Sequence, residues 1–116
     1  MERFEKKLTK TDEGSMLVIP ARFSRNHMRP VEGGRSENIR VVDVGGTEWT
    51  FGYYVRRHRN PRPVLRSGWR RFVLEKELKV GDRIIFERVD GFPELYRIGA
   101  KKRIHLFGQV VWTDVL

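Results

Sequence analysis

Residues 56–71 read RRHRNPRPVLRSGWRR, and this stretch organises the interpretation of the whole chain. Seven of its sixteen residues are arginine, and none is acidic. The 116-residue chain has a formal net charge of +9, so this stretch supplies +7 and leaves +2 for the other hundred residues. Charge this concentrated indicates a local binding surface for an anionic partner rather than a general solubility feature.

The residue types of this stretch favour nucleic acid as the partner. The planar guanidinium of arginine matches phosphate oxygens and the O6/N7 edge of guanine. Pro61 and Pro63 restrict the backbone on either side of Arg62, so less conformational entropy is lost when this segment binds. A solvated basic loop without any ligand is the simpler alternative.

Length and composition narrow the class of protein. A chain of this length with 39% hydrophobic residues is expected to form one domain with a modest core. It has no cysteine, which excludes disulfides and Cys-containing zinc sites, and its three histidines lack metal-ligand spacing. No apolar run approaches the length of about 20 residues that spans a bilayer, and the N-terminus lacks a signal-peptide core. Nucleic acid is the first candidate partner, and an anionic membrane surface is the second.

The sequence contains no pattern that indicates catalysis. No Gly-rich phosphate loop precedes a helix, and there is no Gly-x-Ser-x-Gly elbow. The acidic residues are scattered and mostly stand next to basic ones. We therefore expect neither an enzyme nor a cofactor, metal or small-molecule ligand.

Alternating hydrophobicity and frequent turn residues predict a mainly β fold. Gly45-Gly46 is typical of a two-residue hairpin, and Ser67 is predicted to be the N-cap of a helix. About seven short strands and two short helices are expected, in a small barrel-like arrangement. The expected strands are 3–9, 39–44, 48–55, 64–65, 83–89 and 94–98, with 104–107 and 109–112 as candidate final strands. The expected helices are 21–28 and 69–78, and residues 11–15 are predicted to form a turn. The expected core aromatics are Trp49, Phe51, Trp69, Phe72 and Phe86.

Five segments, in order and at fitting spacings, resemble the plant-type B3 DNA-binding domain family. The likeness covers about residues 4–107, and its strength lies in the order of the segments rather than in any one of them. The segments are Phe4-Glu5-Lys6-Lys7-Leu8-Thr9 with Thr11-Asp12, Leu17-Val18-Ile19-Pro20, Val42-Asp43 through Trp49-Thr50-Phe51, Leu65-Arg66-Ser67-Gly68-Trp69-Arg70-Arg71-Phe72-Val73, and Leu78-Lys79-Val80-Gly81-Asp82 followed by Ile84-Ile85-Phe86.

The resemblance implies an open seven-stranded pseudobarrel with two short helices that grips the major groove of double-stranded DNA between two arms. The first arm falls on Lys10 to Met16 and the second on Arg56 to Arg62. We expect a B3-like DNA-binding domain at residues 1–108, with 109–116 as a C-terminal extension or extra strand. The implied function is sequence-preferring DNA binding as part of a plant transcription regulator in the nucleus, with no membrane partner and with protein partners left open.

Candidate DNA contacts come from both arms and from the start of the helix at Trp69. In the first arm they are Lys10, Thr11, Gly14 and Ser15. In the second arm they are Arg56, Arg57, Arg59, Asn60 and Arg62, and near the helix they are Arg66 and Arg70. Arginine can read guanine and asparagine can read adenine, but most protein–DNA hydrogen bonds go to the backbone. Which of these side chains reads a base therefore stays open.

Two departures from the family pattern leave the preferred DNA sequence open. Many members carry a basic residue where Met16 stands, and many carry Trp-Asn where Arg57-His58 stands. Two other functions remain as alternatives: the DNA-targeting domain of a restriction endonuclease-like protein, and an RNA-binding or protein-interaction module. A module for single-stranded nucleic acid would need exposed aromatics among basic residues, for which Tyr53 and Tyr54 are the nearest candidates.

Overall fold

Strands account for most of the regular structure of the chain. The computed structural model describes residues 2–28, 30–31, 34–56, 62–92 and 94–115. The strands are β1 (Arg3–Lys7), β2 (Leu17–Val18), β3 (Ser36–Asp43), β4 (Glu48–Val55), β5 (Pro63–Leu65), β6 (Arg83–Arg88), β7 (Leu95–Leu106) and β8 (Gln109–Val115). The helices are α1 (Lys10–Gly14), α2 (Ala21–His27) and α3 (Trp69–Glu75).

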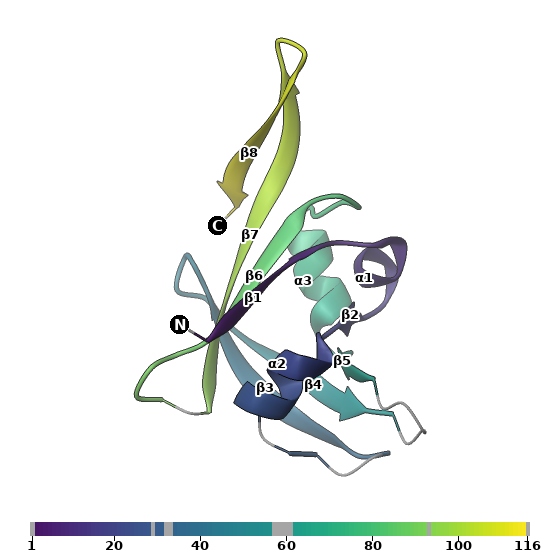
Figure 1. The fold of residues 1–116 in the computed structure, drawn as a ribbon, viewed down its shortest axis with the longest axis vertical. Helices are drawn as coiled ribbons and strands as arrows, with labels where there is room; N and C mark the ends of the chain where they lie inside the picture. The colour runs from purple at the N-terminus through teal and green to yellow at the C-terminus, as the bar shows by residue number, and fades with distance from the viewer. Residues whose placement is uncertain (1, 29, 32–33, 57–61, 93, 116) are drawn as a thin grey trace.

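One curled sheet contains all of these strands (Figure 1). Its main path runs β1-β6-β7-β3-β4-β5-β2, and β8 pairs with the far part of β7. Among the described strands every pairing is antiparallel except that of β3 with β7, where Arg40 to Asp43 lie parallel to Leu95 to Ile98. The seven strands of the main path form the open half-barrel that the sequence predicts, and β8 lies outside this path.

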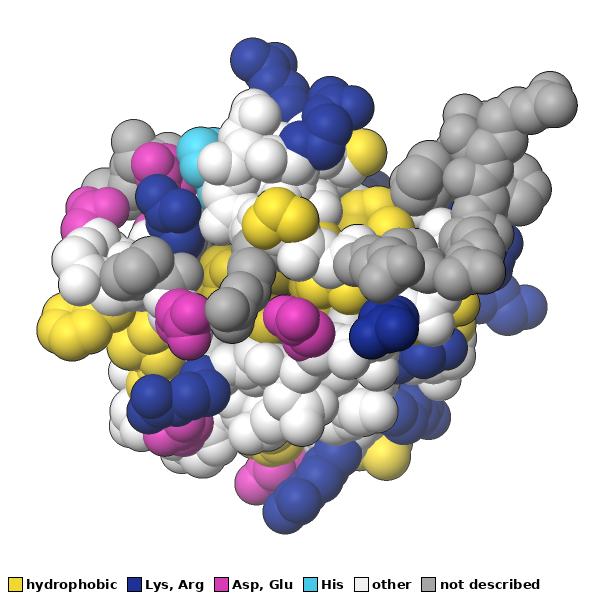
Figure 2. All heavy atoms as spheres, turned by 90° about the horizontal axis from the view of Figure 1, so that it is seen from below, with side chains coloured by type: hydrophobic (Ala, Val, Ile, Leu, Met, Phe, Trp, Pro, Cys, Tyr) yellow, Lys and Arg dark blue, Asp and Glu magenta, His cyan; other side chains and the backbone are white. Residues whose placement is uncertain are grey.

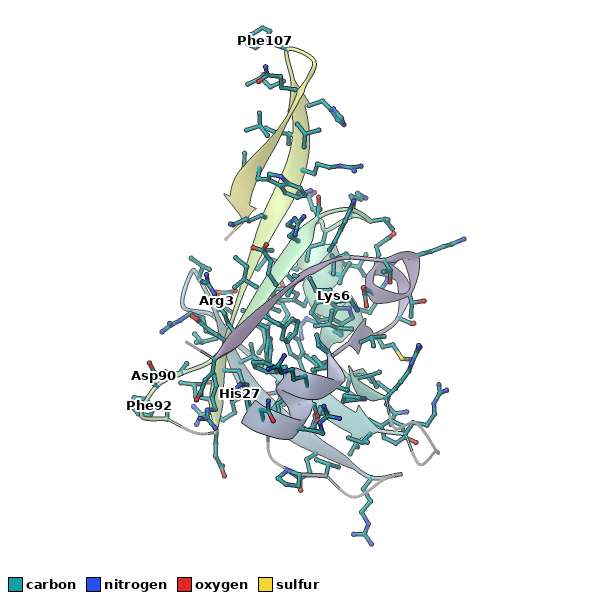
Figure 3. All side chains as sticks on the ribbon, in the orientation of Figure 1. Arg3, Lys6, His27, Asp90, Phe92 and Phe107 are labelled. Carbon is teal, nitrogen blue, oxygen red and sulfur yellow. The ribbon has the colours of Figure 1, made fainter. Side chains whose placement is uncertain are left out.

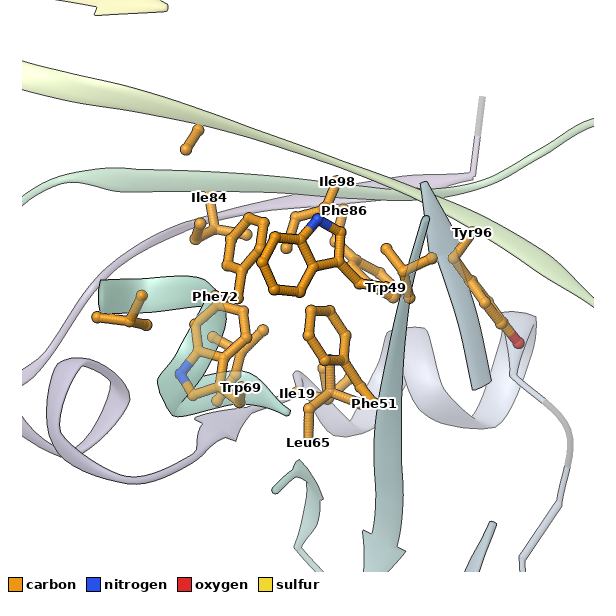
Figure 4. Close-up of a cluster of buried hydrophobic side chains, with 14 of the residues drawn as sticks. Ile19, Trp49, Phe51, Leu65, Trp69, Phe72, Ile84, Phe86, Tyr96 and Ile98 are labelled. Atoms are coloured by element: carbon orange, nitrogen blue, oxygen red, sulfur yellow. The ribbon is translucent and has the colours of Figure 1, made fainter. Parts of the chain in front are cut away.

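An aromatic core joins β4 to α3 (Figure 4). Trp49 and Phe51 of β4 meet Phe72 edge-on, with ring centroids 5.0 and 5.7 Å apart. Trp69 adds a second edge-on contact with Phe51 at 5.8 Å. Such pairs contribute about 0.5–1.5 kcal/mol beyond the apolar area that they bury. All five aromatics predicted for the core, including Phe86, are buried there.

Helix α2 covers another part of the sheet. Its Phe23 packs against Phe4 of β1 and Phe86 of β6, with ring centroids 4.9 and 5.9 Å apart. The short helix predicted after Pro20 is therefore confirmed, and it ends at His27. None of the helices in the described residues is long and apolar enough to cross a membrane.

Two local predictions about turns and caps are wrong. Residues 10–14 form helix α1 rather than a turn, because Thr9 and Asp12 make a reciprocal capping box around its first turn. The N-cap of α3 is Gly68 rather than Ser67, and Gly68 has a φ of 82° with no side-chain cap. A Cβ at Gly68 would lie 2.5 Å from the carbonyl oxygen of Thr50, so the close approach of this helix to β4 requires glycine.

Other boundaries also differ from the sequence-based expectation. The connection between β3 and β4 spans residues 44–47 instead of two residues, because Asp43 Oδ1 accepts a hydrogen bond from Thr47 N at 2.9 Å. Helix α3 ends at Glu75 instead of residue 78, and Glu77 takes a φ of 53°. Strand β7 continues to Leu106, well past the predicted end at residue 98. Within the described residues there are thus eight strands and three helices, where about seven and two were predicted.

Asp43 connects the turn after β3 to helix α3. Its side chain is 2% exposed, and its Oδ2 lies 3.0 Å from Lys76 Nζ. The same oxygen accepts a hydrogen bond from Trp49 Nε1 at 3.0 Å. Burial raises the pKa of this carboxyl, but the hydrogen bonds from Trp49, Lys76 and Thr47 together outweigh burial and bring the pKa below its ordinary value.

We expect Asp43→Asn to destabilise the fold most strongly at neutral pH. Because the folded-state pKa is depressed, the carboxylate stabilises the fold above its unfolded-state pKa of about 3.9, and this contribution is lost as the pH falls through the folded-state pKa. Loss of the charged partner of Lys76 should lower the free energy of unfolding by about 3 kcal/mol at neutral pH. Urea unfolding of the wild-type chain and the variant, at a series of pH values from acid to neutral, measures this difference in the free energy of unfolding. Asp90→Asn, in an exposed turn, is the control, and a pH-independent effect of Asp43→Asn would contradict the expectation.

Candidate nucleic-acid interface

The carboxylate of Asp12 holds residues 10–16, the first arm, in place. Its Oδ1 accepts hydrogen bonds from Lys6 Nζ at 2.8 Å and from Val18 N at 3.1 Å. Its Oδ2 accepts hydrogen bonds from the backbone N and the hydroxyl of Thr9, each at 2.9 Å. The side chain of Asp12 is 0% exposed, so this one buried group connects β1, α1 and β2.

Helix α3 contacts the same arm through two donors. Trp69 Nε1 donates to the carbonyl oxygen of Asp12 at 2.7 Å, and Arg70 Nη1 donates to that of Glu13 at 2.7 Å. Arg70 is among the predicted DNA contacts, and part of its guanidinium is used to hold α1. Its side chain remains 47% exposed. A contact between Arg70 and phosphate stays a prediction.

The root of the second arm, residues 56–62, lies beside the first. Strands β4 and β5 pair up to Val55 opposite Pro63, and Arg56 N donates to the carbonyl oxygen of Arg62 at 3.4 Å. Strand β2, which follows the first arm, pairs with β5, and Ile19 N donates to the carbonyl oxygen of Pro63 at 2.9 Å. The β2–β5 pairing thus fixes the two arm roots relative to each other.

A hollow of about 220 Å³ lies between the two arm roots, and we call it the arm groove. A neighbouring hollow of about 410 Å³ shares Thr11, Val18 and Arg62 with it, so the concave surface continues past the arm groove toward β1. The residues that line the arm groove are Thr11, Met16, Val18, Tyr54, Arg56, Arg62, Val64 and Arg66.

Three arginines of the arm groove carry charge that no acidic group of the described residues balances. Within the described part of the chain, no carboxylate pairs with Arg56, Arg62 or Arg66. The guanidinium of Arg66 lies over the ring of Tyr54, 3.7 Å from its centroid, a cation–π contact that leaves its N–H edges free to donate. The groove is therefore a cationic surface with hydrogen-bond donors.

The arginines on the sheet are arranged differently. Four arginines of β3, β6 and β7 each form an ion pair with a glutamate of a neighbouring strand or of the N-terminal segment. The pairs are Arg40 with Glu48, Arg83 with Glu5, Arg88 with Glu2 and Arg97 with Glu87. Figure 2 looks at the molecule from below. Toward the right edge, the side of α1 and β5 in Figure 1, Lys and Arg side chains stand without Asp or Glu beside them, whereas at the left and bottom of this view basic and acidic side chains lie together.

The structure brings together four of the predicted site residues in the arm groove and places three others outside its lining. Thr11, Arg56, Arg62 and Arg66 line the arm groove. Lys10, Gly14 and Ser15 are exposed on α1 and at its end, outside the lining of this groove. Arg57, Arg59 and Asn60 lie outside the described residues, so their predicted contacts stay predictions.

The sequence did not predict two residues that position the side chains and backbone of the arm groove. Lys6 positions the first arm through Asp12, and Tyr54 supports Arg66. Of the two candidate stacking residues, Tyr53 is buried at 2% exposure, and Tyr54 is half-buried with one face of its ring against the guanidinium of Arg66. The alternation of β4 places Tyr54 on the face opposite Trp49 and Tyr53. Its contact with Arg66 cannot be predicted from the sequence, because the two residues lie on different elements. Among the described residues, no group of His, Cys, Asp or Glu side chains gathers in a way that could hold a metal ion.

A half-barrel with a cationic groove between two arm roots agrees with the two-armed pseudobarrel that the sequence resemblance implies. The chain belongs to the B3 DNA-binding domain family, whose model, described as "B3 DNA binding domain", matches residues 4–102. This is a family of DNA-binding domains and not of enzymes. The match ends within β7 and leaves its last residues and β8 outside.

Relatives and solved structures agree with this assignment. The "AP2/ERF and B3 domain-containing transcription factor RAV1" of Arabidopsis thaliana is 37% identical over 109 residues, which cover 86% of this chain and 30% of that protein. The "B3 domain-containing transcription repressor VAL1" of the same plant is 30% identical, covering 75% of this chain and 11% of that protein. The chain therefore spans less than a third of the length of these two relatives.

Two solved structures share the fold. The structure described as "Arabidopsis FUS3-DNA complex" superposes with a TM-score of 0.75 at 26% identity, covering 85% of this chain and 95% of that one. The Arabidopsis thaliana LEC2–DNA complex has a TM-score of 0.73 at 21% identity, covering 83% of this chain and 88% of that one. At this lower identity the second structure bears on the fold alone.

We expect Lys6→Met to loosen the first arm, whereas Lys7→Met should not. Lys6 is the cation that faces the buried Asp12 carboxylate, and removal of one partner of such a pair typically costs about 3–5 kcal/mol. Lys7 is exposed on the other face of β1, so its substitution changes the net charge equally without this loss. Thermal unfolding measures the stability, and amide hydrogen exchange in α1 measures the local loosening. Equal stabilities of the two variants would show that the Asp12 cluster does not hold the arm.

Proposed function

We propose that this chain binds double-stranded DNA with a sequence preference, with its two arms in the major groove, as the DNA-binding part of a plant transcription regulator. The observation that carries the proposal is the arm groove, where Arg56, Arg62 and Arg66 stand together and pair with no carboxylate of residues 2–28, 30–31, 34–56, 62–92 and 94–115. Membership of the B3 family and the likeness to a structure of a FUS3–DNA complex support it. The transcription factor and transcription repressor among the relatives support a role in the nucleus.

The chemistry of the arm groove suits a phosphate backbone at its floor and base edges at its rim. Guanidinium groups donate in pairs to phosphate oxygens and to guanine, while the hydroxyl of Thr11 can serve either. The fixed arm roots mean that little backbone entropy is lost at this part of the interface when DNA binds. We propose that Lys10, Gly14 and Ser15 on the first arm, with Arg57, Arg59 and Asn60 on the second, extend the contact from this floor, and that Arg70 adds a phosphate contact.

We also propose that residues 1–108 form the DNA-binding unit and that 109–116 add a strand to it rather than a separate module. The pairing of β8 along the far part of β7, from Leu106 opposite Gln109 to Ala100 opposite Val115, supports this division. The family match to residue 102 already includes the part of β7 that pairs with β6 and β3. The DNA-contacting elements therefore all precede β8.

Removal of a groove arginine should lower both the affinity for DNA and its dependence on salt. Contacts with about five to seven phosphates predict that the logarithm of the association constant falls with the logarithm of salt concentration with a slope of about −4.5 to −6. Each of Arg56→Ala, Arg62→Ala and Arg66→Ala should make this slope shallower by about 0.9 if the side chain neutralises one phosphate. Fluorescence anisotropy of a labelled duplex over a salt series measures it.

The matched control for this experiment is Arg97→Ala, which removes the same charge from a residue that pairs with Glu87 on the sheet. It should leave the slope unchanged. A slope near zero for the wild-type chain, or an equal change in all four variants, would contradict a localised DNA surface. Competition by structured RNA separates the rival function, since an RNA-binding module would release the duplex at RNA concentrations that a DNA-binding domain tolerates.

Selection of bound duplexes from a random pool tests the sequence preference itself. We expect enrichment of a short motif, because a mismatch at a well-contacted base pair typically costs about 1–3 kcal/mol. A pool that stays random while the salt slope remains steep would leave electrostatic DNA binding intact and contradict the sequence preference.

A further inference from the structure

The end of β7 and all of β8 form a hairpin that projects from the half-barrel (Figure 1). The two strands pair from Ala100 opposite Val115 to Leu106 opposite Gln109, so the turn consists of Phe107 and Gly108. Both turn residues have positive φ, 51° and 77°, as a two-residue type I′ hairpin requires. Figure 3 shows Phe107 at the far tip, well away from Lys6 and the first arm.

Strand β8 has a free edge. Within the described residues it pairs with β7 and with no other strand. In a two-residue hairpin the flanking pair, here Leu106 and Gln109, exchanges both backbone hydrogen bonds, and the pattern then alternates along the strands. The backbone N–H and C=O groups of Val110 and Trp112 are therefore directed away from β7 toward this open edge.

The hairpin also exposes apolar side chains. Ile104 and Trp112 are 37% exposed, Leu106 and Val110 are 50% exposed, and Phe107 is 96% exposed. Natural edge strands are usually protected by lysine, proline or a bulge, yet residues 109–113, QVVWT, contain no charge and no proline. An unprotected edge of this kind is a template for pairing with another strand.

We propose that β8 pairs antiparallel with β8 of a second copy of this chain, about a two-fold axis through Val111. Opposed residues in an antiparallel pair share one face of the sheet, so a symmetric pairing must centre on a residue. The register centred on Val111 places Val110 opposite Trp112, Gln109 opposite Thr113, and Val111 opposite its own counterpart. This register pairs the uncharged stretch 109–113 with the same stretch of the second copy. The apolar side chains of Val110 and Trp112 then lie opposite each other, and the amide of Gln109 lies opposite the hydroxyl of Thr113.

The basic residues of the hairpin do not favour nucleic acid as the occupant of this edge, because they are directed to the body of the domain. Lys101 Nζ lies 3.8 Å from Glu5, and Lys102 Nζ donates to the carbonyl oxygen of Glu77 at 2.5 Å. Arg103 N donates to Asp82 Oδ1 at 3.0 Å, and its guanidinium lies over Gly81. Arg83 lies over the ring of Trp112, 5.1 Å from its centroid, and so helps to fix this side chain of β8. The edge thus offers apolar groups and backbone donors and acceptors, which suit an identical strand.

Cross-linking through an introduced cysteine tests the register. The chain has no cysteine, so Val111→Cys carries a single thiol. At the two-fold axis, Val111 and its counterpart form a non-hydrogen-bonded pair, whose Cα separation of about 4.5 Å falls within the range that a disulfide spans. Phe107→Cys is the control, since position 107 is far more exposed but lies outside the proposed pairing.

Under mild oxidation we expect Val111→Cys to form a covalent dimer roughly tenfold faster than Phe107→Cys, because pairing holds its thiols within disulfide distance. Equal rates, or faster cross-linking at the tip, would overturn the proposed register.

Sedimentation equilibrium tests the association itself. The wild-type chain should change reversibly from its 13.8 kDa monomer to a dimer as concentration rises. Val110→Pro removes an N–H that faces the open edge and none that faces β7, so it should remain monomeric with an unchanged thermal unfolding midpoint. Phe107→Asn, which removes the most exposed apolar side chain and suits the positive φ, should still form the dimer.

A wild-type chain that remains monomeric up to its solubility limit would overturn the proposal, whether or not another protein binds the hairpin. Loss of the dimer in Phe107→Asn but not in Val110→Pro would also overturn it, because the association would then come from the tip. DNA affinity, measured on a duplex that accommodates one domain, should be the same for Val110→Pro and the wild-type chain, so failure of this proposal is distinct from failure of the proposed function.

Discussion

Four donors converge on the buried carboxylate of Asp12, and the placement of the first arm depends on them. A carboxylate removed from water is costly unless it is paired and hydrogen-bonded. Lys6 of β1, Val18 of β2 and Thr9, the N-cap of α1, supply these partners. The backbone carbonyl of Asp12 also accepts a hydrogen bond from the indole N–H of Trp69. The first arm is therefore attached to the aromatic core, and the position of the arm groove follows from the packing of the fold.

The distribution of ion pairs contributes to the concentration of positive charge at the arm groove. Four arginines of the sheet, Arg40, Arg83, Arg88 and Arg97, pair with glutamates, and exposed pairs of this kind contribute about 0–1 kcal/mol to stability. Their larger effect is to neutralise the sheet surface. Arg56, Arg62 and Arg66 have no such partners in the described part of the chain, so the electrostatic potential there is available to an anionic ligand.

The sequence predicts features that depend on periodicity and composition better than features that depend on a neighbour distant in sequence. Trp49, Phe51 and Phe72 could be assigned to the core because strand and helix periods mark them, and the arginine stretch could be found by counting charge. Helix α1 was mistaken for a turn because its stability comes from the Asp12 contacts with Lys6 and Val18 as well as from its own five residues. The glycine cap of α3 depends on the carbonyl of Thr50, and the role of Tyr54 depends on Arg66. No local pattern contains this information.

The parallel pairing of β3 with β7 has a consequence for biosynthesis. It joins Arg40 to Leu95 and Asp43 to Ile98, which are 55 residues apart in each case, and β1 pairs with β6 across a still longer separation. Contacts of such high sequence separation form slowly, because a long loop must close before they stabilise anything. On the ribosome the half-barrel therefore cannot be completed until β7 has emerged from the exit tunnel. The arginine-rich segment 56–71 therefore emerges before β6 and β7, when the aromatic core still lacks Phe86 and the strand edges that pair in the finished sheet are open to other chains.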